Sequence, residues 1–383
     1  MANGLTIGYT CNIRPPELDN DPRYGEWESR ETIESVIRAF EKTGNRVILI
    51  DADQDVYHKL LRYDREIDIV FNNAEGLQEV EIREAIVPTF CELLSIPYTG
   101  SGPQTLINAL DKPTTKEILT NYGINTPLFQ TMESYTDRLE SDLKFPLMIK
   151  PISEGTSIGI TQESMVESDE ALERAVKRII KEYSQPALVE EFVDGNEYTI
   201  GIIGRYILPI LRIAFDKLPD KPILRDPHIK EIENPYITIM PYNEKGYRDL
   251  ARQTAIAFEA LSCNDYCRMD FRKGRDGKFY FLEMNPLPGI HPTEADLTSM
   301  VKHSGLTHEE MINMIMWEAI KRNRQNKKHT QRFIEDKIEG VRALARSTKA
   351  KLGFYEKPIQ IEDDDFPYRL VKMNPEAVAN GKR

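Results

Sequence analysis

The feature that most constrains the fold is a regular alternation of apolar, strand-like runs with helix-like stretches over the first hundred residues. These segments follow one another at residues 5–10, 31–42, 46–52, 54–62, 68–76 and 79–94. The alternation predicts a parallel sheet with helices on both faces. Ligands of such sheets bind beyond the carboxyl ends of the strands, so we expect residues 10–12, 72–76 and 99–102 to lie near a site.

The pattern changes after residue 110 and is mostly β from about residue 200. Helices are expected at 113–122, 168–183, 243–261 and 307–323, and strands at 128–130, 146–151, 187–191, 197–203, 265–272 and 278–285. The sequence GRDG at 274–277 is typical of a hairpin turn between the last two strands. We therefore predict an α/β (α+β) protein, in which a parallel α/β domain precedes two α+β domains. The expected domain ranges are 1–110, 111–200, 201–320 and, for a helical and basic extension, 321–383.

Composition and charge exclude several classes of protein. The net charge of −12 disfavours a general nucleic-acid binder. No run approaches the roughly 18 apolar residues of a membrane span, and the N-terminus lacks the basic start and apolar run of a signal peptide. The four cysteines are few, and Cys263 and Cys267 have no second ligand pair, so buried free thiols are favoured over a zinc site. We therefore expect a cytoplasmic protein that binds neither nucleic acid nor membrane.

Residues 321–383 differ from the rest of the chain, because they carry 16 basic against 9 acidic residues. A helix is expected at 331–350, with apolar residues three or four apart at Phe333, Ile334, Ile338, Val341 and Leu344. We expect this apolar face to pack on the body of the protein or on a second subunit. A regulatory or carrier-docking arm is the alternative.

The segment FPLMIKPISEGTSIGI (145–160) combines a lysine at the end of a strand with a loop of small residues. Small residues let backbone N–H groups approach phosphate oxygens, and Lys150 supplies a positive charge. The lysine precedes the loop, so the order differs from that of a P-loop. An ordinary β-turn is the alternative, and the motif alone leaves both interpretations open.

The segment LVEEFVDGNEYTIGI (188–202) places two carboxylates before an apolar pair, and Glu197 opens the next strand. An apolar slot with backbone donors and acceptors suits adenine, and a carboxylate suits a ribose diol. Exposed glutamates at strand ends would give the same pattern, so this segment does not decide the question by itself.

The segment YCRMDFRKGRDGKFYFLEMNP (266–286) carries the strongest metal signal. Pairing through its turn would bring together Asp270, Glu283 and Asn285, and two carboxylates with an amide oxygen suit Mg²⁺. Arg268 lies two residues before Asp270, on the same strand face, where it could stabilise negative charge in a transition state. A surface Arg–Asp pair is the alternative, but charges on otherwise apolar strands are costly unless they are used.

In this order, the three segments resemble the ATP-grasp superfamily, and most closely the D-alanine–D-alanine ligase family. The likeness runs from about residue 5 to residue 320. Further matching pieces are ELLSIPYTGSGPQTLINALDKPTTKEIL (92–119), KPISEGTSIG, EEFVDGNEYT, and RMDF with LEMNPLPG. The resemblance implies an ATP-grasp fold whose two α+β domains enclose ATP. It also implies a ligase that joins a carboxylate to an amine through an acyl-phosphate and releases ADP and phosphate.

The resemblance implies roles for the residues at matching positions. The ATP phosphates would be held by Lys112 and Lys150. The loop that closes over them would include Glu154, Thr156, Ser157 and Gly159, with Thr156 counted among the catalytic residues. Adenine would meet Glu190 and Val193, and the ribose hydroxyls would meet Glu197. Two Mg²⁺ ions, or Mn²⁺ in their place, would bind Asp270, Glu283 and Asn285. The tetrahedral intermediate would be stabilised by Arg268 and the backbone of Gly289.

Departures from the family pattern concern the substrate end of the site. Residues 9–29 replace a glycine-rich loop that carries a glutamate, whose work Glu28 or Glu26 could take over. Glu75 stands where the family has a histidine, which favours a cationic or hydroxyl-bearing substrate group. Glu294, or Ala295 in a register shifted by one residue, stands where a serine receives the acceptor's carboxylate, and a glutamate there would repel it. Lys230 is the candidate for the lysine of the family's lid.

We therefore expect an ATP-dependent ligase similar to D-alanine–D-alanine ligase but with different substrates, taking a small amino-acid-like carboxylate and an amine. A true D-alanine–D-alanine ligase of peptidoglycan synthesis is one alternative. A non-catalytic ATP-binding protein is another, disfavoured because Arg268 and the metal-ligand types are all present. The resemblance also implies a homodimer.

Overall fold

The computed structural model describes residues 4–18, 21, 24–77, 80–155, 157–218, 224–226, 229, 237–325, 333, 335–355, 359 and 367–374. Two of the predicted site residues, Thr156 and Lys230, lie outside these described residues.

The N-terminal part forms the predicted parallel sheet, with strand order β2-β1-β3. Its elements are β1 (Thr6–Cys11), η1 (Pro16–Leu18), α1 (Arg30–Glu41), β2 (Arg46–Asp51), α2 (Val56–Tyr63), β3 (Ile69–Asn73), η3 (Arg83–Ala85) and α3 (Ile86–Leu93). The helix expected at 79–94 is shorter than predicted, because α3 begins only at Ile86. This start places Pro88 in the first turn, where a proline costs no helical hydrogen bond.

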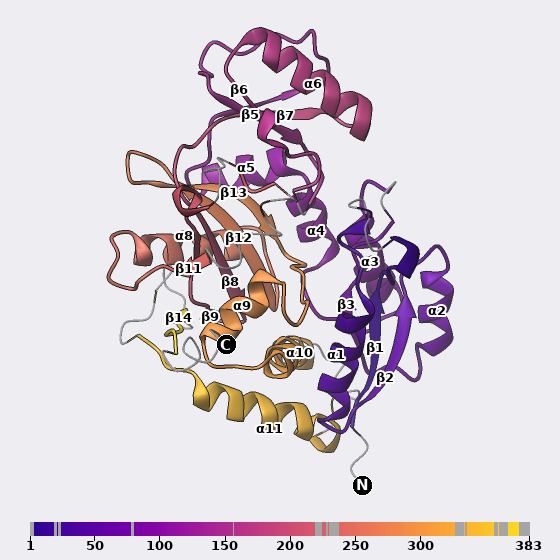
Figure 1. Ribbon diagram of the computed structural model, residues 1–383. Coiled ribbons are helices and arrows are strands. Elements are labelled where there is room, and N and C mark those ends of the chain that lie inside the picture. The colour runs from indigo at the N-terminus through magenta and orange to yellow at the C-terminus, as the bar shows by residue number, and fades with distance from the viewer. Residues whose placement is uncertain are drawn as a thin grey trace.

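The next part contains an antiparallel sheet of order β4-β7-β5-β6 (Figure 1). Its elements are α4 (Pro103–Leu110), α5 (Lys112–Asn121), β4 (Phe129–Met132), β5 (Leu147–Pro151), η4 (Gln162–Ser164), β6 (Met165–Val166), α6 (Asp169–Tyr183) and β7 (Ala187–Glu191). Helix α6 packs on β5, β6 and β7. Its N-terminus is capped by Ser168, whose side chain accepts a hydrogen bond from the Ala171 N–H.

The third part is built on a larger sheet whose main path runs β11-β10-β8-β12-β13, with β9 paired to β8 and β14 paired to β9. Its elements are β8 (Glu197–Ile203), β9 (Tyr206–Ile207), β10 (Leu211–Ile213), η5 (Phe215–Lys217), β11 (Ile237–Ile239), α8 (Tyr247–Ala260), β12 (Tyr266–Lys273), β13 (Phe279–Asn285), α9 (Asp296–His303), α10 (His308–Arg324) and β14 (Arg369–Leu370). Parallel and antiparallel sheets thus combine with helices, which confirms the predicted fold class. Because β8 starts at Glu197, its sheet begins just before the predicted boundary at residue 200.

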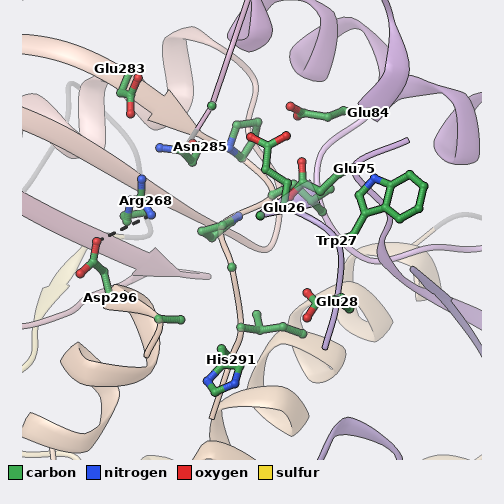
Figure 2. Close-up of a pocket in the computed structure, with 18 of the residues that line it drawn as sticks. Glu26, Trp27, Glu28, Glu75, Glu84, Arg268, Glu283, Asn285, His291 and Asp296 are labelled. Atoms are coloured by element: carbon green, nitrogen blue, oxygen red, sulfur yellow. Dashed lines mark ion pairs between the residues drawn. The ribbon is translucent and has the colours of Figure 1, made fainter. Parts of the chain in front are cut away.

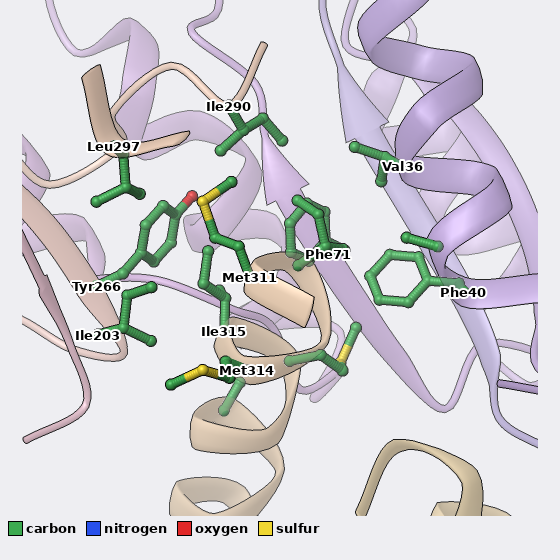
Figure 3. Packing of buried hydrophobic residues seen from close by; sticks show 14 of the residues in the cluster. Val36, Phe40, Phe71, Ile203, Tyr266, Ile290, Leu297, Met311, Met314 and Ile315 are labelled. Carbon is green, nitrogen blue, oxygen red and sulfur yellow. The ribbon is translucent and has the colours of Figure 1, made fainter. Parts of the chain in front are cut away.

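A shared hydrophobic core joins the first and third parts (Figure 3). Phe40 of α1 and Phe71 of β3 pack edge to face, with ring centroids 5.2 Å apart. The same cluster includes Met311 and Ile315 of α10, and Tyr266 of β12. Burial of large side chains is the main stabilising term in folding, so this shared core fixes the N-terminal sheet against the third part.

Helix α11 (Glu335–Lys351) crosses the base of the molecule beneath α10 and reaches α1 (Figure 1). Phe333, Ile338 and Val341 are buried in the shared core. Lys337 Nζ lies 2.8 Å from Asp68 Oδ1 in the N-terminal part. The apolar face therefore packs on the body of the protein, as predicted, although Ile334 of the predicted stripe lies outside the described residues.

Two further expectations concern membranes and thiols. Among the described residues, no helix combines the length and the apolar character needed to cross a membrane. Cys11, Cys91, Cys263 and Cys267 are buried free thiols, which agrees with the interpretation favoured from the sequence.

Candidate active site

The β12–β13 hairpin brings the predicted metal ligands together. Asp270 and Glu283 are Cα partners across the two strands, and Arg268 is the partner of Asn285. The register shifts by one residue between Asp270 and Phe271, a β-bulge of the kind that re-aims side chains next to active sites. The turn at 274–277 therefore gives the pairing that the sequence predicted.

Asp270 occupies an environment that suits a bound cation. Its side chain is almost fully buried, and Arg268 Nη2 lies 3.0 Å from Oδ2. Within the described part of the chain, Oδ1 has no hydrogen-bond partner. Burial raises the pKa of Asp270, Arg268 opposes this shift, and the charge of Glu283 adds to it. A cation beside Oδ1 would satisfy that oxygen and relieve the repulsion between the two carboxylates.

The hairpin donors therefore fit a hard divalent cation, because oxygen ligands from two carboxylates and an amide are those that Mg²⁺ and Mn²⁺ accept. No cluster of three His, Cys, Asp or Glu side chains that could hold a metal occurs among the described residues. The mixed set of Asp270, Glu283 and Asn285 thus remains the candidate metal site.

Arg268 lies between two acidic residues. It contacts Asp270 on its own strand, and its Nη1 atom lies 3.8 Å from Asp296 Oδ2 at the start of α9 (Figure 2). Asp296 in turn accepts two hydrogen bonds from Arg225, at 3.1 and 3.0 Å. The guanidinium of Arg268 is thereby oriented from two sides at the edge of the large cavity described below.

The two predicted phosphate lysines lie on different elements that face the same hairpin. Lys112 is the first residue of α5, and its Nζ atom lies 3.9 Å from Glu283 Oε2 and donates to the Glu154 carbonyl. Lys150 lies on β5, and its Nζ atom is 2.6 Å from Glu190 Oε1. Both ammonium groups are buried, and neither has a counterion of its own, since both carboxylates have further cationic neighbours.

A small cavity of about 70 Å³ opens between the second and third sheets. Its apolar lining is provided by Met148, Ile160, Phe192, Val193 and Leu282. Polar groups at its edge include Lys150, Glu190 and Glu197, of which Glu197 lies 3.7 Å from Arg272 Nε. Glu190, Val193 and Glu197, which were predicted to meet adenine and the ribose, therefore line one cavity.

The predicted phosphate loop follows β5. Ser157 and Gly159 both have positive φ values, of 62° and 79°, so their N–H groups point differently from those of an extended strand. Ser157 Oγ donates to the Arg225 carbonyl at 2.8 Å, and Gln185 donates to Glu154 Oε1 at 2.7 Å. The loop is thus tied both to its own sheet and to the segment around Arg225.

A second, larger cavity of about 550 Å³ lies between the hairpin and the N-terminal part (Figure 2). One side is formed by Arg268, Glu283 and Asn285, and by the turn that contains Gly289. Figure 2 shows the opposite side, where Glu26, Trp27, Glu28, Glu75 and Glu84 face the cavity. Glu283 and Asn285 of the predicted metal site therefore line one continuous space with the predicted substrate residues, whereas Asp270 lines the small cavity.

The N-terminal wall of the large cavity is acidic. Burial raises the pKa of Glu75 well above its usual range, and the nearby charges of Glu26 and Glu84 raise it further. Burial likewise raises the pKa of Glu84 to about 7, with Arg83 opposing the shift. Arg83 Nη2 lies 3.6 Å from Glu26. Arg83 and Lys112 thus face three carboxylates, and the acidic groups outnumber the basic ones, so a cationic group at this wall would be stabilised.

The two other predicted substrate residues differ in exposure. Glu28 is only 7% exposed and accepts a hydrogen bond from Asn73 Nδ2. Burial raises its pKa to about 7, against the opposing effects of Thr32 and Arg14. The side chain of Glu294 is 77% exposed, with Oε2 4.0 Å from His291 Nδ1, at the rim of the cavity.

Three segments that follow strands of the parallel sheet were expected to lie near a site, and one of them contributes to the lining of the large cavity. Residues 72–76 supply Glu75 to the large cavity, whereas residues 10–12 and 99–102 do not line it. Asn12 Oδ1 accepts a hydrogen bond from the Gly76 N–H at 2.7 Å, so the first segment supports the 72–76 loop. Gly100 donates to Asp265 Oδ2 at 2.8 Å, so the third segment docks on the hairpin part instead.

Several residues of the site were not predicted from the sequence. They are Arg83, Glu84, Lys116, Arg225 and Asp296. Lys116 follows Lys112 by one helical turn, a spacing that puts both on one face of α5. That spacing was the one available signal, since the other four lie in loops, in a short 3₁₀ helix or at a helix start.

Comparison with known proteins identifies the family. The family model for the D-ala D-ala ligase C-terminus matches residues 118–317. The D-alanine–D-alanine ligase of Aquifex aeolicus is 33% identical over 290 residues, which cover 75% of this chain and 94% of the relative. The uncharacterized protein y4sG of Sinorhizobium fredii is 31% identical over 337 residues, covering 83% of this chain and 98% of that protein.

Solved structures agree on the fold. The D-alanine–D-alanine ligase of Bacillus anthracis complexed with ATP superposes with a TM-score of 0.66 at 20% identity, covering 84% of this chain and 99% of that one. The enzyme from Coxiella burnetii gives a TM-score of 0.64 at 18% identity, covering 86% and 98%. These likenesses confirm the ATP-grasp fold expected from the sequence. The chain belongs to the D-alanine–D-alanine ligase family of ATP-grasp proteins.

Proposed function

We propose that this chain is an ATP-dependent ligase that joins a carboxylate to an amine through an acyl-phosphate, with release of ADP and phosphate. The observation that carries the proposal is the hairpin that holds Asp270, Glu283, Asn285 and Arg268 at the edge of a 550 Å³ cavity. A set of metal donors beside a fixed guanidinium suits phosphoryl transfer, in which positioning and electrostatic stabilisation do most of the catalysis.

In this proposal ATP binds between the second and third sheets. Adenine occupies the small cavity beside Val193 and the backbone of Glu190, and Glu197 holds the ribose hydroxyls. Lys112 and Lys150 neutralise the phosphates, and the loop with Glu154, Ser157 and Gly159 covers them. The hairpin ligands would hold two Mg²⁺ ions, or Mn²⁺, which would neutralise phosphate charge and orient the terminal phosphate. We include Thr156 and Lys230 in the phosphate site on the family pattern.

The donor carboxylate then attacks the γ-phosphorus, the bond to ADP breaks, and an acyl-phosphate forms. The acceptor amine attacks the acyl carbon, and as the tetrahedral intermediate collapses the C–O bond to phosphate breaks and the phosphate leaves with the proton lost by the amine. Arg268 and the Gly289 N–H donate hydrogen bonds to the negative oxygen of that intermediate, whose charge develops at the edge of the large cavity. No protein nucleophile is needed, since the phosphate itself activates the carboxylate.

We further propose that the substrates differ from two D-alanines. Glu26, Glu75 and Glu84 face the cavity with Arg83 as their neighbouring cation, which favours a substrate with a cationic group near the N-terminal wall. At the rim, Glu294, or Ala295 in a register shifted by one residue, stands where the family pattern places the serine that receives an acceptor carboxylate. A glutamate repels a carboxylate, so an acceptor that is an amine without a nearby carboxylate fits this rim better.

The relatives named D-alanine–D-alanine ligase make that reaction the second candidate for this chain. The acidic wall and Glu294 argue against it. A non-catalytic ATP-binding role is the third candidate. Arg268 and Asp270 argue against that role, because a buried pair of charges at a site without chemistry would cost stability without a compensating use.

Phosphate release provides the first test. Purified protein with ATP and Mg²⁺ is given a panel of amino acids, dipeptides and amines that includes D-alanine, and the products are identified by mass spectrometry. We expect release that requires two substrates, with a product lighter by one water than their sum. ATP binding without release across the whole panel would favour the non-catalytic role, and D-alanyl-D-alanine as the preferred product would establish the second candidate.

The substrate residues are tested by Glu75→Gln and Glu294→Gln, with Glu84→Gln as a third variant. Each substitution replaces a carboxyl group that can ionise with a neutral amide of similar size. We expect altered preference between cationic and neutral substrates, with the Michaelis constant for ATP within about twofold of the wild-type value. An effect confined to the ATP constant would refute the assignment of these glutamates to the substrate end.

A further inference from the structure

Lys116 is a fully buried cation that no step of the proposed reaction uses. Its relative exposure is 0%, and it does not line either cavity. An isolated ammonium group in a protein interior costs several kcal/mol of stability unless it is paired and hydrogen-bonded. Its contacts therefore indicate what this residue does.

The Lys116 ammonium contacts both sheets that border the small cavity. Its Nζ atom lies 3.0 Å from Glu190 Oε2 on β7 and donates to the Phe281 carbonyl on β13 at 3.2 Å. The ring centroid of Phe281 lies 5.9 Å from the same nitrogen, a distance at which a cation–π contact contributes. One side chain from α5 thus joins the second sheet to the third, behind the predicted nucleotide slot.

Glu190 connects Lys116 to Lys150. The second oxygen of its carboxylate, Oε1, lies 2.6 Å from Lys150 Nζ. In the β5–β7 register, Glu190 is the partner of Met148, two residues before Lys150. The two side chains therefore share one face of the sheet as diagonal neighbours. Lys150 lines the small cavity, whereas Lys116 lies behind it.

Lys116, Glu190 and Lys150 form a trio in which two lysines contact one carboxylate. Burial alone would raise the pKa of Glu190, but Lys116 and Lys150 outweigh burial and lower it to about 2. Burial lowers the pKa of Lys116 to about 8, and Glu190 opposes that shift. The trio thus places two lysines against one carboxylate, which leaves a surplus of one basic group.

We propose that Lys116 is a positioning residue for the nucleotide phosphates: it neutralises Glu190 from behind, so that the ammonium of Lys150 is free to pair with phosphate. If Glu190 had Lys150 as its sole cation, the buried carboxylate would hold that ammonium for itself. With Lys116 in place, Glu190 is neutralised from behind, and the surplus ammonium group is that of Lys150, which lines the cavity.

The inference rests on the proposed ATP site, and it concerns affinity for phosphate rather than for the base. Loss of Lys116 should weaken ATP binding through Lys150 and leave binding of the phosphate-free nucleoside almost unchanged. If Lys116 had a purely structural role, its loss would weaken the binding of ATP and of adenosine alike, because a collapsed slot would exclude adenine as well.

The test compares ATP and adenosine binding by calorimetry, in Mg²⁺, for the wild-type protein and for Lys116→Met. We expect ATP affinity to fall about tenfold or more, as for loss of a hydrogen bond to a charged group, and adenosine affinity to stay within about twofold. Because the methionine side chain would leave a buried carboxylate less well neutralised, Lys116→Gln is made in parallel. It keeps a hydrogen-bond donor, so it should fold more readily and show the same ligand selectivity.

A double-mutant cycle isolates the coupling between the two lysines. If Lys116 acts through Lys150, then Lys116→Met should have little further effect on ATP affinity in a Lys150→Met protein. Lys337→Met is the matched control, because it removes a lysine that also pairs with a carboxylate, Asp68, far from the slot. This control should leave the affinity for both ligands unchanged.

The outcomes separate the inference from the proposed function. Wild-type protein that binds no ATP would remove both. Wild-type protein that binds ATP, with both Lys116 variants binding ATP as tightly as wild type, would overturn the inference alone. Equal losses for ATP and adenosine, or additive effects in the cycle, would also overturn it, since Lys116 would then act on the slot as a whole.

Discussion

Arg225 holds Asp296 through two nitrogens of its guanidinium, at 3.1 and 3.0 Å, although the two residues are 71 positions apart. Asp296 also lies 3.8 Å from Arg268. Arg225 therefore fixes the carboxylate that helps to orient Arg268. Since the Arg225 carbonyl also accepts a hydrogen bond from Ser157, this contact links the phosphate loop to the proposed transition-state donor.

Replacing Asp296 with Asn should disturb that orientation without removing the donor. The amide keeps one hydrogen-bond acceptor but loses the charge that holds both guanidinium groups. We expect kcat to fall about tenfold, as for a misplaced catalytic group, with ATP affinity within about twofold of the wild-type value. Steady-state kinetics together with calorimetry would measure both, and an unchanged kcat would show that Asp270 alone orients Arg268.

Replacing Arg268 with Ala should have a larger effect on turnover. Removal of one donor to a developing oxyanion costs about 10²-fold or more in rate, so we expect a loss of at least that size with ATP binding nearly intact. Arg205→Ala, which breaks a pair with Glu259 outside both cavities, is the control and should keep full activity. An equal loss of nucleotide affinity in Arg268→Ala would contradict the proposed role.

The pairing of the β12–β13 hairpin could be predicted from the sequence because its geometry is local. A two-stranded unit with a turn at 274–277 fixes its own register, so Asp270, Glu283 and Asn285 had to meet once the strands formed. The N-terminal parallel sheet was predictable for a similar reason, because the spacing of apolar runs alone indicates β–α alternation.

The acidic N-terminal wall of the large cavity could not be derived from the sequence in this way. Glu26 and Glu75 come from two loops and Glu84 from the 3₁₀ helix η3, and only tertiary packing sets them around one cavity. Glu84 lay inside a predicted helix and gave no sign of its role. The buried position of Lys116 was hidden for a different reason: helical periodicity identifies a face, but a lysine on that face is expected at the surface.

Glu28 gives a prediction about stability and pH. Its folded pKa is about 7, above the ordinary value of 4.5, mainly because of burial. The folded state therefore binds this proton more tightly than the unfolded state, and its contribution to stability is lost as the pH rises from about 4.5 to about 7. Glu28→Gln cannot ionise, so its stability relative to wild type should improve as the pH rises from 5 to 8, by at most about 3 kcal/mol.

Denaturant unfolding at pH 5 and pH 8 would measure this difference. Glu34→Gln is the control, because Glu34 is an exposed residue of α1 paired with Arg30, and it should show a much smaller change between the two pH values. A stability difference between Glu28→Gln and wild type that is the same at both pH values would contradict the ionisation of a buried carboxylate.

Gly340 tests how the C-terminal helix stabilises the body of the protein. A Cβ atom at this position would lie 2.0 Å from the Thr43 carbonyl oxygen, so any side chain must push α11 away from the turn after α1. We expect Gly340→Val to lower the free energy of unfolding by about 1–3 kcal/mol, as for an overpacked core site, and to speed proteolysis within α11. Ala343→Val, at an exposed position of the same helix, should cost much less. If both variants unfold and are cleaved like wild type, close packing of α11 against Thr43 does not contribute to stability, and the contact between Lys337 and Asp68 would remain as the link between this helix and the N-terminal sheet.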